Sequence, residues 1–93
     1  MNKYEVVYIL NAKLDDSAVE ALIEKFKGVV TENGGTVEGV DKWGVKKLAY
    51  AIDYKTEGNY VLMNFEAGAD VPAELERQMR ITDDVMRFIV VRK

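Results

Sequence analysis

The first residues of the chain alternate in a pattern typical of a β-strand. Residues 4–10 are rich in β-branched and aromatic side chains, and Asn11 ends the run. In a strand the even-numbered residues share one face and the odd-numbered residues share the other. Glu5 lies on the odd face, which indicates that this face is open. We therefore expect Tyr8, on the even face, to point into the core.

The spacing of apolar residues then changes from two to three or four, which predicts a helix. Residues 15–17 open this helix, and Ser17 with Glu20 fits a capping box. The sequence Asn33-Gly34-Gly35 is expected to end it. The apolar stripe consists of Val19, Leu22, Ile23, Phe26, Val29 and Val30.

Two further strand patterns follow, over residues 36–52 and 60–67, and they predict a hairpin. Residues 53–59 hold turn-forming side chains, with Gly58 expected at a positive φ. The first of the two strands contains two glycines expected to form bulges or bends, Gly39 and Gly44.

A second helix is predicted to begin at residues 70–72, with Asp70 as its cap and Pro72 in its first turn. Leu75 and Met79 share one face of this helix, and residues 85–91 form a last strand. The order strand, helix, strand, strand, helix, strand predicts an α+β ferredoxin-like sandwich. Such a fold has a four-stranded antiparallel sheet with both helices on one face, so the other face meets solvent or a partner. We expect one domain, residues 1–93.

Composition narrows the possible chemistry, because the chain has no cysteine and no histidine. These absences exclude disulfides, thiolate sites, the usual zinc ligands and the commonest general base. The acidic pairs 15–16 and 83–84 lack metal-site spacing, and no glycine-rich phosphate loop is present. We expect no enzyme activity, no cofactor, no metal and no small-molecule substrate.

The net charge is −3, but it is unevenly distributed. Residues 1–41 carry four cations and eight anions, whereas residues 42–93 carry nine cations and eight anions. A generic nucleic-acid-binding protein is basic as a whole, so any RNA binding would use a local patch and a partner. The longest apolar run near the N-terminus, residues 6–10, is too short for a membrane span or signal core. We expect a soluble, cytoplasmic protein with no membrane partner.

Lys46 and Lys47 lie next to each other in an apolar, aromatic tract, residues 43–50. Neighbours on a strand point to opposite faces, so both share one patch only if the backbone turns. Two interpretations stay open: contact with phosphate, or lysines that protect an edge strand from aggregation.

A second basic group follows, and guanidinium groups suit phosphate recognition. The alternative is a solvated surface with local ion pairs to nearby carboxylates. The group consists of Arg77, Arg80, Arg87, Arg92 and Lys93.

Aromatic residues suggest two further sites. Trp43 beside Gly44 is a candidate interface anchor, because Trp is enriched in binding hot spots. Residues 7–12 resemble the first-strand motif of RNA recognition motif domains, in which the residue at Tyr8 stacks on a base. The companion segment, residues 57–64, lacks the required basic and aromatic residues, and Tyr8 is expected to point inward. We therefore do not favour that interpretation.

Several segments in a specific order and spacing carry a family resemblance. They are Tyr4-Glu5 with Ile9-Leu10-Asn11, Gly34-Gly35, Trp43-Gly44, Lys46-Lys47-Leu48-Ala49-Tyr50, Gly58 to Ala67, Glu74-Leu75-Glu76-Arg77, Arg80-Ile81 and Asp84 to Phe88. Together they resemble the family of the sixth protein of the bacterial small ribosomal subunit over nearly the whole chain.

The resemblance implies a structural role in the small ribosomal subunit and no catalysis. It implies binding to the central domain of 16S ribosomal RNA, as a heterodimer with the eighteenth small-subunit protein, which is basic in this family. It implies RNA or partner contacts at Lys46, Lys47, Arg80 and Arg87, which match the family's basic regions. We expect RNA contacts also at Arg77, Arg92 and Lys93, and partner contacts at Trp43 and Tyr50. Two departures matter: Val45 stands where many members have a third basic residue, and many members continue beyond the position of Lys93.

Two alternatives come from other functional classes. The first is a regulatory domain of the same fold that forms homodimers and binds a small molecule. The second is a small enzyme that cleaves acyl or phosphoryl groups, which would need an anion-binding loop that the sequence lacks.

Overall fold

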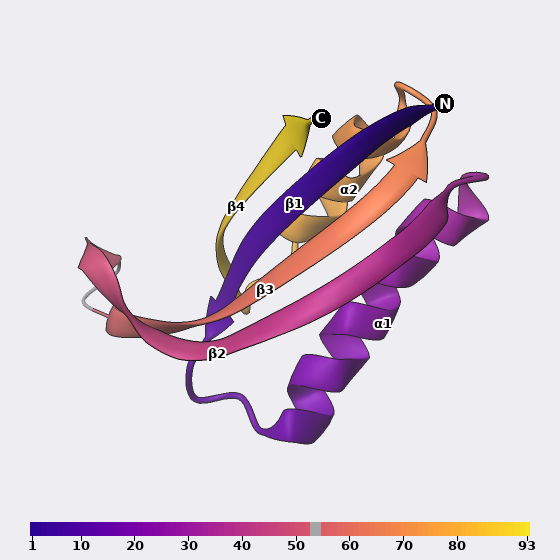
Figure 1. The fold of residues 1–93 in the computed structure, drawn as a ribbon. Coiled ribbons are helices and arrows are strands. Elements are labelled where there is room, and N and C mark those ends of the chain that lie inside the picture. The colour runs from indigo at the N-terminus through magenta and orange to yellow at the C-terminus, as the bar shows by residue number, and fades with distance from the viewer. Residues whose placement is uncertain (53–54) are drawn as a thin grey trace.

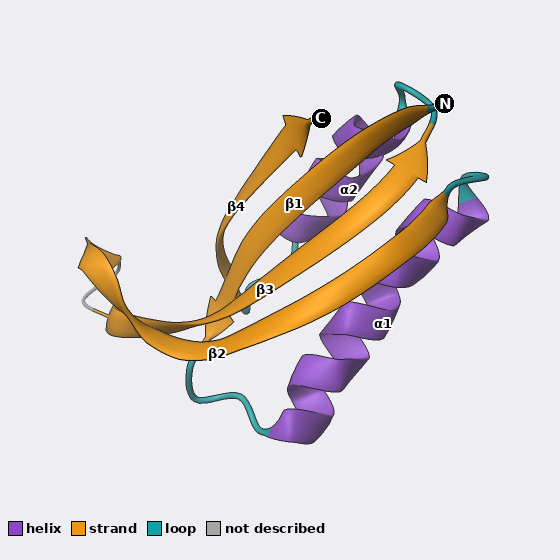
Figure 2. Cartoon of the chain, viewed as in Figure 1, coloured by secondary structure: helices purple, strands orange, loops and turns teal. Residues whose placement is uncertain are grey.

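The computed structural model describes the backbone of residues 1–52 and 55–93 and the side chains of residues 1–48 and 56–93. Four strands form one antiparallel sheet in the order β2-β3-β1-β4, and both helices cover the same face of it (Figure 1). This arrangement confirms the predicted ferredoxin-like sandwich (Figure 2). The elements are β1 (Asn2–Asn11), α1 (Asp16–Glu32), β2 (Thr36–Ile52), β3 (Lys55–Ala67), α2 (Val71–Arg80) and β4 (Val85–Arg92).

The core lies between the sheet and the two helices. The even-numbered side chains of β1 are buried there, as its alternating pattern predicts. Tyr4 stacks on Phe65 with ring centroids 5.4 Å apart, and Tyr8 meets the edge of Phe26 at 5.2 Å. Burial of Tyr8 confirms that it points inward, so it is not available to stack on a base.

The ends of the helices agree with the sequence only in part. Asp15 caps α1, because its Oδ1 accepts a hydrogen bond of 2.8 Å from the amide of Ala18. The predicted capping box of Ser17 and Glu20 is wrong, since Ser17 already lies inside the first turn. Gly34, with φ of 85°, ends α1 as predicted.

The second helix begins at Val71, with Pro72 in its first turn as predicted. Asp70 occupies the cap position, but its backbone is helical and its side chain makes no cap hydrogen bond within the described part of the chain. The predicted cap position is therefore confirmed, and the side-chain hydrogen bond expected of a cap is not formed.

The hairpin is longer than the sequence predicts, because β3 already begins at Lys55. Gly58 lies within β3, paired with Asn11 on one side and Lys46 on the other, and its φ is not positive. The predicted turn position is therefore wrong. A Cβ at Gly58 would lie 2.3 Å from Cγ2 of Ile9 and 3.3 Å from Cδ2 of Leu48, so the glycine permits close packing.

Bulges in β2 occur where the sequence predicts them. The pairing of β2 with β3 shifts by one residue between Val37 and Gly39 and again between Lys42 and Gly44. Gly44 has φ of 84°, which residues with a side chain rarely adopt. The second bulge changes the direction of the side chains that follow it.

Candidate functional site

The sheet has a second face, which neither helix covers (Figure 1). We call it the open face. It carries the odd-numbered residues of β1 and the residues that pair with them on β3 and β4. Several are large apolar side chains in solvent: Ile89 is 54% exposed and Val91 is 52% exposed. Exposed apolar residues that adjoin one another on a sheet indicate an interaction surface.

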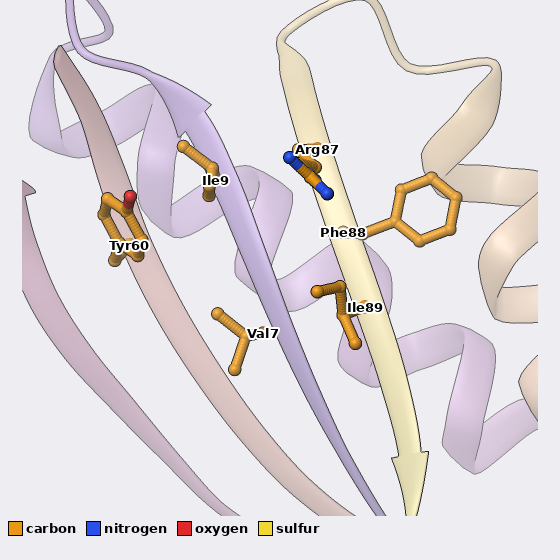
Figure 3. A pocket seen from close by; sticks show the side chains of 6 residues that line it. All are labelled: Val7, Ile9, Tyr60, Arg87, Phe88 and Ile89. Carbon is orange, nitrogen blue, oxygen red and sulfur yellow. The ribbon is translucent and has the colours of Figure 1, made fainter. Parts of the chain in front are cut away.

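A shallow hollow of about 200 Å³ lies on the open face between β3, β1 and β4. Its floor and walls are formed by Val7, Ile9, Tyr60, Arg87 and Ile89 (Figure 3). Phe88 also borders it, but its ring points away toward α2, where the guanidinium of Arg80 lies 5.8 Å from the ring centroid. The hollow is smaller than the roughly 300–1,000 Å³ of drug-sized ligand pockets.

An aromatic pair lies beside the hollow. The indole of Trp43, 41% exposed, stacks on Tyr60 with a centroid separation of 6.3 Å and an interplanar angle of 16°. The indole Nε1 donates a hydrogen bond of 3.2 Å to Oδ2 of Asp41. The ammonium of Lys46 lies 5.2 Å from the centroid of the Trp43 ring system, a cation–π distance. The bulge at Gly44 places Trp43 and Lys46 on the same face.

The two adjacent lysines lie on opposite faces of the sheet. Lys46 pairs with Gly58 and therefore points to the open face, whereas Lys47 pairs with Glu57 and points to the other face. Both are exposed. The structure thus separates the two members of the basic tract, and Lys46 alone joins the aromatic pair.

The two arginines of α2 lie on the helix layer, away from the open face. Arg77 forms a forked pair with Glu74, with Nε to Oε2 at 3.0 Å and Nη2 to Oε1 at 2.7 Å. This pair, with a further hydrogen bond from Gln78, lowers the pKa of Glu74 to about 2. Arg80 lies over Phe88. The local ion pair considered in the sequence is therefore present for Arg77.

The remaining basic residues divide between the two faces. Arg87 borders the hollow on the open face. Lys93 also lies on the open face, where its Nζ donates to Oδ1 of Asn64 at 2.5 Å. Arg92 pairs with Tyr4 on the helix-covered side and donates from Nη2 to Oδ1 of Asn2 at 2.8 Å. Of the seven predicted RNA contacts, Lys46, Arg87 and Lys93 therefore share the open face. Lys93 lies at the other end of β1 from Arg87, because its amide donates to the carbonyl of Lys3, and its Nζ is 3.6 Å from Oε2 of Glu5.

The structure describes one of the two predicted partner contacts. Trp43 is exposed on the open face, while the side chain of Tyr50 lies outside the described residues. Sequence reasoning placed Ile9 on the open face but singled out none of Tyr60, Ile9 and Ile89 as a binding residue, and so missed the hollow. The signal was the alternation of residues 85–91, which places Arg87, Ile89 and Val91 on one face.

The described residues contain no cluster of acidic side chains suited to a metal ion. Within the described residues, no helix is both long and apolar enough to cross a bilayer.

Comparison with known proteins identifies the family. Residues 3–92 match the family model described as ribosomal protein S6. The small ribosomal subunit protein bS6 of Clostridium novyi is 57% identical over 91 residues, which cover 98% of this chain and 96% of that protein. The corresponding protein of Clostridium beijerinckii is 55% identical with the same coverage.

A solved structure supports the same family. The crystal structure of 30S ribosomal protein S6 from Thermotoga maritima superposes with a TM-score of 0.93 at 28% sequence identity, covering 99% of this chain and 87% of that one. The predicted family is confirmed: the chain belongs to the ribosomal protein S6 family, whose members are structural proteins of the small ribosomal subunit and not enzymes.

Proposed function

We propose that this chain, acting as one domain over residues 1–93, binds the central domain of 16S ribosomal RNA as a heterodimer with the eighteenth small-subunit protein. The family resemblance implies both partners. The observation that carries the proposal is the open face, where exposed apolar side chains lie beside Lys46 and Arg87 in a chain of net charge −3.

A heterodimer accounts for this combination of features. A chain with a negative net charge gains little from general attraction to RNA, because phosphate binding depends on the cations placed at the contact. A basic partner supplies the missing positive charge. Exposed Ile89, Val91 and Trp43 supply apolar area of the kind that protein interfaces bury.

The basic residues named in the sequence divide into two groups under this proposal. Lys46, Arg87 and Lys93 lie on the open face and are proposed to contact RNA. Lys47, Arg77, Arg80 and Arg92 lie elsewhere, and their proposed contacts require that RNA also reach the helix layer or the sheet edge. Trp43 and Tyr50 are proposed to contact the partner.

The test is a binding assay with the purified chain, the eighteenth protein and a transcript of the RNA central domain. We expect a ternary complex in gel-shift experiments, and weaker RNA binding when the partner is left out. Removing one cation that binds a phosphate should reduce the slope of log affinity against log salt by about 0.7–0.9. Failure to form a complex with either molecule would overturn the proposal, and equal RNA binding with and without the partner would overturn the heterodimer.

The lysine tract offers a variant with matched controls. Lys46→Ala with Lys47→Ala should weaken the ternary complex and leave the melting temperature nearly unchanged, because both side chains are exposed. Lys13→Ala, at an exposed lysine between β1 and α1, is the control. Unfolding of the double variant would show that the lysines are structural.

A further inference from the structure

The turn between α1 and β2 holds the single Asn-Gly step of the chain, Asn33-Gly34. Asn33 is exposed at the C-cap of α1, and Gly34 follows it with φ of 85°. Asparagine is a thermolabile residue. A following glycine makes it more so, because no side chain hinders attack by the glycine nitrogen on the asparagine amide. Neither residue belongs to the open face, so this chemistry is separate from the proposed function.

The reaction proceeds through a cyclic imide. The backbone nitrogen of Gly34 forms a bond to Cγ of Asn33 and gives up its proton, while the bond from Cγ to Nδ2 breaks and the side-chain nitrogen leaves as ammonia with that proton. Water then opens the ring at one of its carbonyl carbons. One opening gives aspartate, and the other gives isoaspartate, in which the chain continues through Cβ and Cγ.

The folded structure holds both reacting groups away from this reaction. With ψ of 19° at Asn33, the Gly34 nitrogen is nearly eclipsed with the backbone nitrogen of Asn33 about the Cα–C bond. Ring closure requires that nitrogen to lie alongside Cβ instead. Nδ2 of Asn33 donates a hydrogen bond of 2.7 Å to the carbonyl of Val29. The amide of Gly34 donates to the carbonyl of Thr31 at 3.2 Å, so both hydrogen bonds must break before the ring forms.

The next residue fixes the turn against the core. The amide of Gly35 donates to the carbonyl of Val30 at 2.8 Å. A Cβ on Gly35 would lie 2.8 Å from Cγ1 of Val30 and 2.9 Å from Cβ of Ala67, so the turn is seated against the end of β3 (Figure 2). Val30 and Ala67 are fully buried. The turn therefore opens only when the packing around it opens.

We propose that Asn33 is a site of spontaneous deamidation that folding protects, so that the modification records the time a chain has spent unfolded. The unfolded chain rotates about the Cα–C bond of Asn33 and lacks both hydrogen bonds, so it reaches the ring-closing arrangement. The folded chain reaches that arrangement only through local opening of the turn. The loss of ammonia makes the modification irreversible.

The products fit the turn less well than asparagine does. Aspartate replaces the donor to the Val29 carbonyl by a carboxylate oxygen, which loses the hydrogen bond and puts a negative charge at the C-terminal end of the helix dipole. Isoaspartate adds a backbone carbon just before Gly35, which has no spare room. Asn33→Asp should therefore melt at a lower temperature than the parent, and an equal melting temperature would overturn this consequence.

The test compares the full chain folded in sodium chloride with the same chain unfolded in guanidinium chloride, at matched ionic strength, pH and temperature. Mass spectrometry of the tryptic peptide 28–42 follows the replacement of the Asn33 amide by a hydroxyl. We expect conversion to be at least about tenfold faster in the unfolded chain. Equal rates in the two states, or no conversion in the unfolded chain, would overturn the inference. The slow internal controls are the asparagines that precede a residue with a side chain: Asn2, Asn11, Asn59 and Asn64.

Two glycine variants separate the chemistry from the protection. Gly34→Ala puts a side chain beside the attacking nitrogen and should slow conversion in guanidinium chloride. Gly35→Ala strains the seat of the turn, so it should speed conversion in the folded chain and leave the rate in guanidinium chloride unchanged. An unchanged rate for Gly34→Ala would overturn the ring mechanism, and an unchanged folded rate for Gly35→Ala would overturn protection by the turn. If Gly35→Ala fails to fold, the parent's rates in its two states decide the test.

Discussion

The two faces of the sheet differ sharply, although they use the same four strands. On the covered face, Val6, Tyr8 and Leu10 of β1 are fully buried beneath the helices. On the open face, Ile89 and Val91 of β4 keep about half of their surface in solvent. Burial of apolar area stabilises the fold, so stability resides mainly on the covered face. The open face leaves apolar and cationic groups available for binding.

Removing a large side chain from the covered face should have the largest effect. Phe26→Ala deletes a fully buried ring that meets Tyr8, and it should lower the free energy of unfolding by about 3–5 kcal/mol. Ile89→Ala on the open face is the control and should change it by less than about 0.5 kcal/mol. Urea denaturation measures both. Similar losses would show that the open face is part of the stabilising core.

The next effect concerns the contact between β3 and β1. Gly58→Ala would place a Cβ 2.3 Å from Cγ2 of Ile9, so we expect a loss of about 1–3 kcal/mol from strain. Adding Ile9→Ala should recover part of this loss, because it removes the clashing methyl group. Thermal unfolding of the parent, the two single variants and the double variant completes a double-mutant cycle. Additive losses would contradict the clash.

A smaller change, of opposite sign, is expected at Tyr8. Its hydroxyl is buried and has no hydrogen-bond partner in the described part of the chain, and burial raises the pKa of this phenol well above its ordinary value. Tyr8→Phe should therefore stabilise the protein by about 1 kcal/mol, because it removes an unsatisfied buried group. The urea midpoint should rise with an unchanged slope. A fall in the midpoint would show that the hydroxyl has a partner.

The smallest effect is expected at the exposed pair of α2. Hydrogen bonds from Arg77 and Gln78 lower the pKa of Glu74 from 4.5 to about 2. A carboxyl with a lowered folded-state pKa stabilises the fold above its unfolded pKa, so this contribution is lost as pH falls from about 4.5 to about 2. The stability difference between the parent and Arg77→Gln should shrink over this window. A difference that stays constant with pH would contradict the ion pair. Because the pair is exposed, the effect should be small.

The buried residues of the covered face could be predicted from the sequence, whereas close contacts within the sheet could not. Period-two alternation placed Tyr8 inside, and three-residue spacing placed Phe26 on the buried stripe, since a large apolar face must be covered. The position of Gly58 could not be predicted in the same way. A glycine in a turn and a glycine under a neighbouring side chain look alike until the packing of Ile9 is known.

The candidate site was predictable only in part, for a related reason. Lys46 and Arg87 could be named as cations, but their meeting on one face depends on strand order and on the register of β2 with β3. Tyr60 could not be singled out, because an aromatic residue in a strand suits either face. Its place beside the hollow follows from its pairing with Ile9.

The bulge at Gly44 has a consequence for how neighbours along β2 are recognised. In a regular strand, residues three apart point to opposite sides, yet Trp43 and Lys46 meet on one side because the bulge inserts one unpaired residue. Two residues three positions apart therefore share a side within this strand, as they do in a helix. A substitution that flattened the bulge would exchange the sides of Val45, Lys46 and Lys47 and turn Lys47, rather than Lys46, toward the indole. The bulge that precedes the two lysines thus decides which of them the open face presents.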